Sequence, residues 1–99
     1  MSGDDPELRG AFDRLEALLE FPVDFPMKVM GRRVDGFAQA IAEVVGRHVP
    51  GFDPAGIELR SSSQGTWLSV TVVARVQSRA QLEALYRELA DHPLVRMVL

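Results

Sequence analysis

The pattern of apolar and polar residues switches between two periods along the chain. A period of two is typical of strands, and a period near 3.6 is typical of helices. The clearest period of two runs from Thr66 to Val76. One face of that stretch consists of Leu68, Val70, Val72, Ala74 and Val76, and the other of Trp67, Ser69, Thr71, Val73 and Arg75. A shift of one residue would bury Arg75, so the pattern predicts a strand with a well-specified register.

Three more segments have the composition of strands. In residues 25–32, the apolar Phe25, Met27 and Val29 alternate with a less apolar set. Residues 57–60 alternate in the same way, and residues 94–99 are apolar on both faces. The Ser-Ser-Ser-Gln-Gly run at 61–65 predicts a hairpin, because its glycine suits a left-handed turn position.

Helical spacing marks three other segments. Asp5 is a good N-cap for a first helix, which the Phe-Pro pair at 21–22 ends. We expect Asp35 to cap a second helix over residues 36–48. Ser78 and Gln81 have the spacing of a capping box at the start of a third helix.

The order of these segments is a helix followed by β-α-β-β-α-β, which is the ferredoxin-like order of an α+β fold. With right-handed crossovers, the two β-α-β units interleave into a four-stranded antiparallel sheet with the strand order 4-1-3-2. Both long helices then cover one face of the sheet, and the other face is either solvated or used. We expect a single domain over residues 1–99, with an acidic N-terminal segment and helix at 1–20 and the ferredoxin-like core at 21–99.

Composition narrows the class of protein. The chain has 99 residues, of which 46% are hydrophobic, and a domain of this size buries enough surface to fold unaided. It contains no cysteine, which excludes disulfides, thiol catalysis and thiolate metal sites. Its net charge of −3 argues against nonspecific binding to nucleic acids or membranes. No apolar run approaches the roughly 20 residues of a membrane span, and the acidic N-terminus is unlike a signal peptide, so we expect a cytoplasmic protein.

No set of residues in the sequence has the pattern of an active site. His48 and His92 each fall in the last turn of a predicted helix, where the helix dipole favours them, so we interpret both as structural. The serines fall in a hairpin and at a helix cap, without an obvious base. Acylphosphatases share the predicted fold and need an arginine in the first loop, where Arg32 and Arg33 lie, but they also need an asparagine, and this chain has none. We therefore predict a protein that is not an enzyme and that needs neither a metal nor a cofactor.

Several separated stretches carry a resemblance to known proteins. They are the Leu-Glu-Phe-Pro of 19–22, Phe25 with the Lys-Val-Met-Gly of 28–31, the Arg-His-Val-Pro-Gly of 47–51, the hairpin of 61–71, the Leu-Tyr-Arg-Glu-Leu of 85–89 and the Val-Arg-Met-Val-Leu of 95–99. Together they resemble the YbeD-like family of small bacterial proteins over residues 18–99. The resemblance implies a ferredoxin-like fold similar to the regulatory ACT domains of amino-acid biosynthetic enzymes. The family has no established biochemical function and supplies no catalytic residues, although its genes often lie beside lipoate-attachment genes.

The similarity to ACT domains suggests a first candidate site. ACT domains bind small molecules near the loop that follows their first strand and at subunit interfaces. By this analogy, Gly31, Arg32 and Asp35 are candidate ligand-binding positions. The analogy comes from the fold and not from a motif.

The open face of the predicted sheet is the second candidate site. If the alternation holds, Lys28, Arg60, Arg75 and Arg96 all project from this face, against the single carboxylate of Glu58. They would form a weak site for anions, either a carboxylate metabolite or an acidic segment of a partner. The alternative is a solvated sheet face with unremarkable charges.

The terminal strand is the candidate interface. Its apolar residues are Leu94, Val95, Met97, Val98 and Leu99. We expect it at an edge of the sheet, where unpaired backbone groups invite pairing with another chain. A soluble protein must cover such an edge, and we expect either a homodimer partner or the chain's own N-terminal segment to do so.

The sequence as a whole favours a non-enzymatic regulatory or interaction module, homo-oligomeric, that binds a small anionic metabolite or a protein partner. The alternative is an RNA-binding or other anion-binding module that uses the open face of the sheet. RNA recognition needs aromatic residues on that face to stack bases, and Trp67 alone supplies one, so nucleic acid is the less favoured partner.

Overall fold

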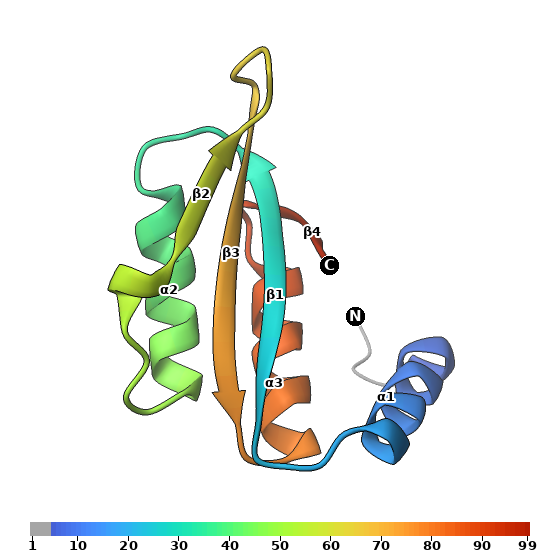
Figure 1. Cartoon of the computed structure of the whole chain (residues 1–99). Helices are drawn as coiled ribbons and strands as arrows, with labels where there is room; N and C mark the ends of the chain where they lie inside the picture. The colour runs from blue at the N-terminus through green and yellow to red at the C-terminus, as the bar shows by residue number, and fades with distance from the viewer. Residues whose placement is uncertain (1–4) are drawn as a thin grey trace.

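One antiparallel sheet with helices packed against it organises the chain in the computed structural model, which describes residues 5–99 (Figure 1). The helices are α1 (Pro6–Leu18), α2 (Phe37–His48) and α3 (Arg79–Asp91), with a 3₁₀ turn at Pro54–Gly56. The strands are β1 (Val23–Arg32), β2 (Glu58–Ser61), β3 (Trp67–Val76) and β4 (Val95–Val98). The first four residues of the expected acidic segment lie outside the described residues. None of the three described helices is long and apolar enough to cross a bilayer.

The order of the strands is β2-β3-β1-β4, which is the predicted order 4-1-3-2 read from the other edge. The central strands β1 and β3 pair antiparallel over their full ten residues, from Val23 opposite Val76 to Arg32 opposite Trp67. Figure 1 shows α2 and α3 behind the sheet and the other face of the sheet open. The predicted α+β architecture, with a four-stranded antiparallel sheet and three helices, is confirmed.

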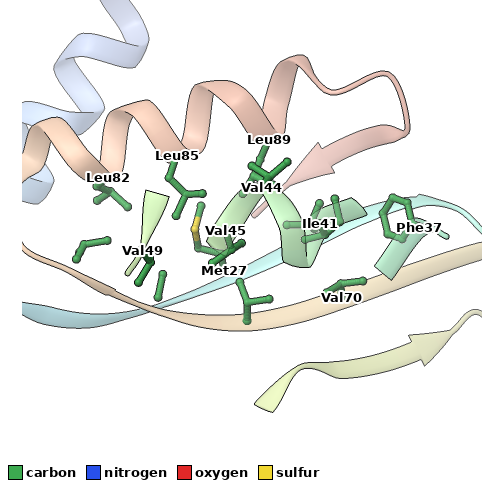
Figure 2. Packing of buried hydrophobic residues seen from close by; sticks show 14 of the residues in the cluster. Met27, Phe37, Ile41, Val44, Val45, Val49, Val70, Leu82, Leu85 and Leu89 are labelled. Carbon is green, nitrogen blue, oxygen red and sulfur yellow. The ribbon is translucent and has the colours of Figure 1, made fainter. Parts of the chain in front are cut away.

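An apolar core fills the space between the sheet and its helices (Figure 2). The inward side chains of β3, from Val70 to Val76, are buried as the alternation predicts, whereas Val73 and Arg75 on the other face are exposed. Helices α2 and α3 contribute Phe37, Ile41, Val44, Val45, Leu82, Leu85 and Leu89. Burial of one such side chain contributes roughly 1.5–3 kcal/mol, so this core holds both helices against one face of the sheet.

The helix starts agree with the sequence at two of three positions. The Asp5 carboxylate accepts hydrogen bonds from the backbone N–H groups of the first turn of α1, and the Ser78 hydroxyl accepts one from the backbone N–H of Gln81. The prediction that Asp35 caps α2 is wrong. Gly36 is the N-cap, with a φ of 82° and no side-chain hydrogen bond to the helix. The chain enters α2 through a left-handed residue, a conformation that glycine adopts at little cost, so the Asp35 carboxylate is not used there.

Strand β1 begins at Val23, two residues before the predicted start, and it contains a proline. Lys28 exchanges both backbone hydrogen bonds with Leu99, so the backbone groups of alternate residues point toward the β4 side. Pro26 is the next residue of that set, beyond the paired part of β4. Its missing N–H therefore removes no bond to β3, which is how a proline fits within a central strand.

The pairing of β1 with β4 contains a bulge. Met30 lies opposite Met97, but the adjacent Gly31 lies opposite Val95, so Arg96 is an extra residue in β4. A bulge of this kind interrupts the alternation of side chains. It allows Arg96 to project from the open face together with Met97, where strict alternation would have sent the two side chains to opposite faces.

Gly31 is required by close packing on the helix side of the sheet. A Cβ atom built at Gly31 would lie 2.3 Å from the backbone oxygen of Leu94 and 2.6 Å from the Phe37 ring. Only a residue without a side chain allows α2 and the chain before β4 to approach β1 this closely. In contrast, a Cβ atom at Gly46, within α2, would meet no atom within 4 Å.

We expect Gly31→Ala to lower the free energy of unfolding by about 1–3 kcal/mol, because the added methyl group overlaps backbone and ring atoms. Gly46→Ala is the matched control and should raise the free energy of unfolding by up to about 1 kcal/mol, since alanine favours the helix. Urea unfolding followed by circular dichroism measures both. Effects of the same sign for the two variants would contradict the packing role of Gly31.

Candidate functional site

Four cations on the open face of the sheet form no ion pair with any carboxylate of residues 5–99. They are Lys28 and Arg32 on β1, Arg60 on β2 and Arg96 on β4. The ion pairs that the structure does contain involve other cations. An un-neutralised cluster of this sign attracts anions even on a protein whose net charge is negative.

The register of the sheet sets the spacing of these charges. Lys28 on β1 lies opposite Thr71 on β3, and Thr71 lies opposite Glu58 on β2. Lys28 and Glu58 are therefore two strands apart in the same row across the sheet. Neighbouring strands are about 4.8 Å apart, which puts about 10 Å between the backbones of Lys28 and Glu58. Glu58 is closer to Arg60, two residues along β2, but within residues 5–99 it forms no ion pair with Arg60 or with Lys28.

Trp67 lies among the cations and contacts two of them. The guanidinium carbons of Arg32 and Arg96 are 5.3 and 5.4 Å from the centroid of its ring. Both distances are within the range of a cation–π interaction. Arg96 reaches the ring across β1, from the bulge in β4. The indole thus positions both guanidinium groups on the open face.

A shallow hollow of about 330 Å³ lies beside Trp67 on the same face. Its floor includes Met30, Ser69 and Leu99, and Lys28 and Arg60 stand at its sides. All of its lining residues belong to the strands, the β2–β3 hairpin or the chain end, so no helix closes it. The hollow combines an apolar floor with two cations, which suits a ligand that has both carboxylate and apolar groups.

Arg75 does not belong to this cluster, although the sequence places it on the same face. Its guanidinium pairs with the Asp24 carboxylate at 3.3 Å, at the far end of the sheet from Trp67. Sequence reasoning missed Asp24 because it started the strand at Phe25. Arg32 takes the place of Arg75 in the cluster, and the alternation of Lys28 and Met30 could have indicated it, since Arg32 is the next residue of that series.

The positions suggested by analogy to ACT domains are not brought together. Gly31 is buried and faces the core. Arg32 belongs to the open face, and Asp35 lies in a separate hollow of about 520 Å³ between the β1–α2 loop and Gly65 of the hairpin. The first loop and the open face are therefore two distinct surfaces.

Both histidines make contacts within the fold. His48 Nε2 lies 2.6 Å from a Glu88 carboxylate oxygen, and Arg47 pairs with the same carboxylate, so these residues join α2 to α3. His92 Nδ1 accepts a hydrogen bond from the backbone N–H of Leu94 at 3.1 Å. Across residues 5–99, no three metal-ligating side chains lie together.

The candidate interface strand β4 lies at an edge of the sheet, as expected. One side of β4 pairs with β1, and the backbone N–H and C=O of Val98 point away from β1. In the part of the chain that the structure describes, no second strand pairs with this outer edge. Leu94, Met97 and Leu99 are exposed. The described part of the N-terminal segment, α1, packs against α3 and reaches only the end of β4 through side chains.

The fold and this face define a class of protein, a small α+β domain with a cationic open sheet face. Residues 16–99 match the family described as protein of unknown function (DUF493). The chain is 51% identical over 84 residues to a UPF0250 protein of Bordetella pertussis, a match that covers 85% of this chain and 92% of the relative. A UPF0250 protein of Nitrosomonas europaea is 45% identical over 84 residues, with 85% of this chain and 97% of the relative covered. The chain belongs to the DUF493 family of UPF0250 proteins, which confirms the resemblance to YbeD-like proteins.

The family has no named activity, so the open face must be tested through its own chemistry. We expect a double-mutant cycle of Trp67→Leu and Arg96→Gln to give a coupling free energy of about 0.5–1 kcal/mol, the range of an exposed cation–π pair. Urea unfolding of the two single variants and the double variant measures it. Arg75→Gln with Trp67→Leu is the control cycle and should show no coupling, because Arg75 pairs with Asp24 instead. Equal coupling in both cycles would argue against the contact.

Proposed function

We propose that this protein is a non-enzymatic interaction module whose open sheet face binds a carboxylate-rich segment of a partner protein. The observation that supports the proposal is the cluster of four cations around Trp67 and its apolar hollow, which have no carboxylate partner within residues 5–99. Such a segment would replace the missing carboxylates and cover the apolar floor at the same time. Both effects favour binding, and neither requires a reaction.

The spread of the charges favours an extended segment over a small metabolite. The cations come from β2, β1 and β4, which span three strand spacings, or about 14 Å. A single small carboxylate can contact the pair at the hollow, Lys28 and Arg60, but not the whole cluster. A segment with several carboxylates can contact all of it. A small anionic metabolite remains the second candidate because the hollow itself is large enough to receive one.

The arrangement of Trp67 argues against RNA as the partner. A base that stacks on the indole would have to displace a guanidinium group that already contacts the ring. Trp67 is also the one aromatic side chain that β1 and β3 place on the open face, since Phe25 faces the core side. Single-stranded RNA recognition normally uses two or three stacked bases.

We expect a ten-residue peptide of alternating Glu and Val to bind the native chain and to shift the fluorescence of Trp67, with an affinity that falls as salt is added. Replacing Lys28 and Arg96 together with Gln should weaken binding at least tenfold, which is about 1.4 kcal/mol. The matched control is Arg75→Gln, which removes a cation of the same face that is already paired. Equal affinities of the double variant and this control would refute the proposal.

A thermal-shift panel separates the candidate ligand classes. Amino acids, lipoate-related acids, nucleotides, short single-stranded RNA and the peptide should each be tested separately. A specific ligand at a hundred times its own dissociation constant adds about 2.7 kcal/mol to the stability of the protein. Stabilisation by the peptide alone supports a protein partner. Stabilisation by one of the small acids, lost in Lys28→Gln, would assign the face to a metabolite, and stabilisation by RNA at low salt would replace the proposal with the RNA-binding alternative.

We also propose that a second copy of the chain covers the outer edge of β4. The support is an exposed apolar strand with outward-facing backbone groups, next to exposed Met97 and Leu99. Two such edges can pair with each other and hide their apolar side chains.

Analytical ultracentrifugation over a wide range of concentrations should find a dimer, and hydrogen exchange should show protection of the Val98 amide that is lost on dilution to the monomer. A chain that is monomeric throughout, with fast exchange at Val98, would contradict the proposal. Protection of Val98 in the monomer would indicate that the chain's own N-terminal segment covers the edge.

A further inference from the structure

The amphipathic helix α1 lies on a surface away from the open face, and its contacts come from both apolar and polar groups. Phe12 is 4% exposed and meets the ring of Tyr86 edge-on, with 5.8 Å between the ring centroids. Leu8 and Leu15, one turn before and one turn after, pack against the same core. The apolar stripe of α1 thus faces α3 and the lower half of β1, as Figure 1 shows for the ribbons.

Arg79 clamps α1 from the polar side. Its guanidinium pairs with the Asp13 carboxylate, with Glu16 at 3.0 Å and with Glu83 at 2.6 Å, and it lies 3.4 Å from the backbone oxygen of Arg9. Glu83 and the two carboxylates of α1 raise the pKa of Arg79 above its usual value. Arg79 is the first residue of α3, where the helix dipole disfavours a cation. The carboxylates of Asp13 and Glu16 on α1, together with that of Glu83 on α3, therefore explain why a cation occupies this position.

The fit between α1 and the rest of the protein is incomplete. A hollow of about 230 Å³ remains between them, with Leu8 and Phe12 on one side and Phe25, Met27 and Val98 on the other. Leu18, at the end of α1, is 81% exposed. The Phe12–Tyr86 contact, the flanking Leu8 and Leu15 and the Arg79 ion pairs hold α1 in place, while an open hollow beside them interrupts the packing.

Most of α1 also lies outside the family domain. The match to the DUF493 family begins at residue 16, whereas α1 begins at Pro6. The Nitrosomonas relative has only 3% of its chain outside its match, so it has almost no residues to build such a helix. Residues 16–99 contain Phe25, Leu82 and Tyr86 but only the last three residues of α1, so most of the helix that covers these side chains lies outside the family match.

We propose that the groove between α3 and the β1–β4 edge is a docking site for an amphipathic helix of a partner protein, and that α1 is its competing occupant within the same chain. The bound α1 defines the chemistry of the partner helix. It carries an aromatic anchor in the position of Phe12 and carboxylates one and four residues later, as Asp13 and Glu16 do, to pair with Arg79. Leu99 lines the hollows of both this site and the open face, but the charged clusters are separate, so substitutions at Phe12 and Glu16 leave the cations of the proposed function in place.

The test uses the full chain and a labelled peptide of residues 5–18 as the probe. In the chain with Phe12→Ala and Glu16→Gln, α1 should leave the groove, and the peptide should bind at least tenfold more tightly than to the native chain. The control chain carries Arg14→Gln, on the exposed side of α1, and should bind the peptide as weakly as the native chain does. A peptide with Phe12→Ala should not bind any of them. Chemical-shift changes at Leu82 and Tyr86 would locate the bound peptide, and equal binding by all three chains would overturn the proposal.

A measurement on the native chain keeps the test decisive if the double variant does not fold. Excess peptide should displace α1 and raise the hydrogen-exchange rates of α1 amides, while those of Leu85 and Leu89 in α3 stay unchanged. Unchanged exchange in α1 with excess peptide would overturn the proposal. A native dimer that exchanges α1 between its subunits would also overturn it, since the occupant of the groove would then be a second copy.

Discussion

The full-length pairing of β1 with β3 is the constraint on which both the core and the candidate site depend. It places Met27 and Val29 in the core together with Val70 and Val72, and it sends the alternate residues to the open face. A slip of one residue would bring Lys28 into the core and expose its apolar neighbours, so the burial of the core selects the register. Packing of the core on one side of the sheet consequently determines which side chains project from the other side. Substitutions that loosen the core will therefore also change the spacing of the cations on the open face.

The protein presents two surfaces of different chemistry on the two sides of its sheet. The open face has a shallow apolar floor and cations that pair with no carboxylate of the described chain, whereas the groove under α1 is mostly apolar and has one ionic cluster at Arg79. The first surface belongs to the part of the chain that is shared with the DUF493 relatives, and the second is covered by a helix that precedes that part. The two proposed sites have separate charged clusters, and Leu99 lines the hollows of both.

The parts of the fold that were predicted from the sequence depend on local patterns. The alternation in β3 identified its buried side chains, and the order of helices and strands indicated the topology of the sheet. The errors arose where distant parts of the chain act on each other. Asp24 joins β1 because the end of β3 pairs with it, and this takes Arg75 out of the cluster. Arg96 lies on the open face as the alternation suggested, but for a different reason, a bulge that is visible only once β4 is aligned with β1. The cap of α2 was missed for a local reason, since both Asp35 and Gly36 suit a helix start and the turn geometry selects the glycine.

Pro26 has a consequence for the behaviour of the protein at high concentration. It lies in the half of β1 beyond the last pair with β4, where no strand of residues 5–99 pairs with this side of β1. A foreign strand that tried to extend the sheet there would meet a ring in place of a hydrogen-bond donor. Pro26 therefore disfavours the pairing of an added strand with this side of β1, which is the contact through which cross-β fibrils grow.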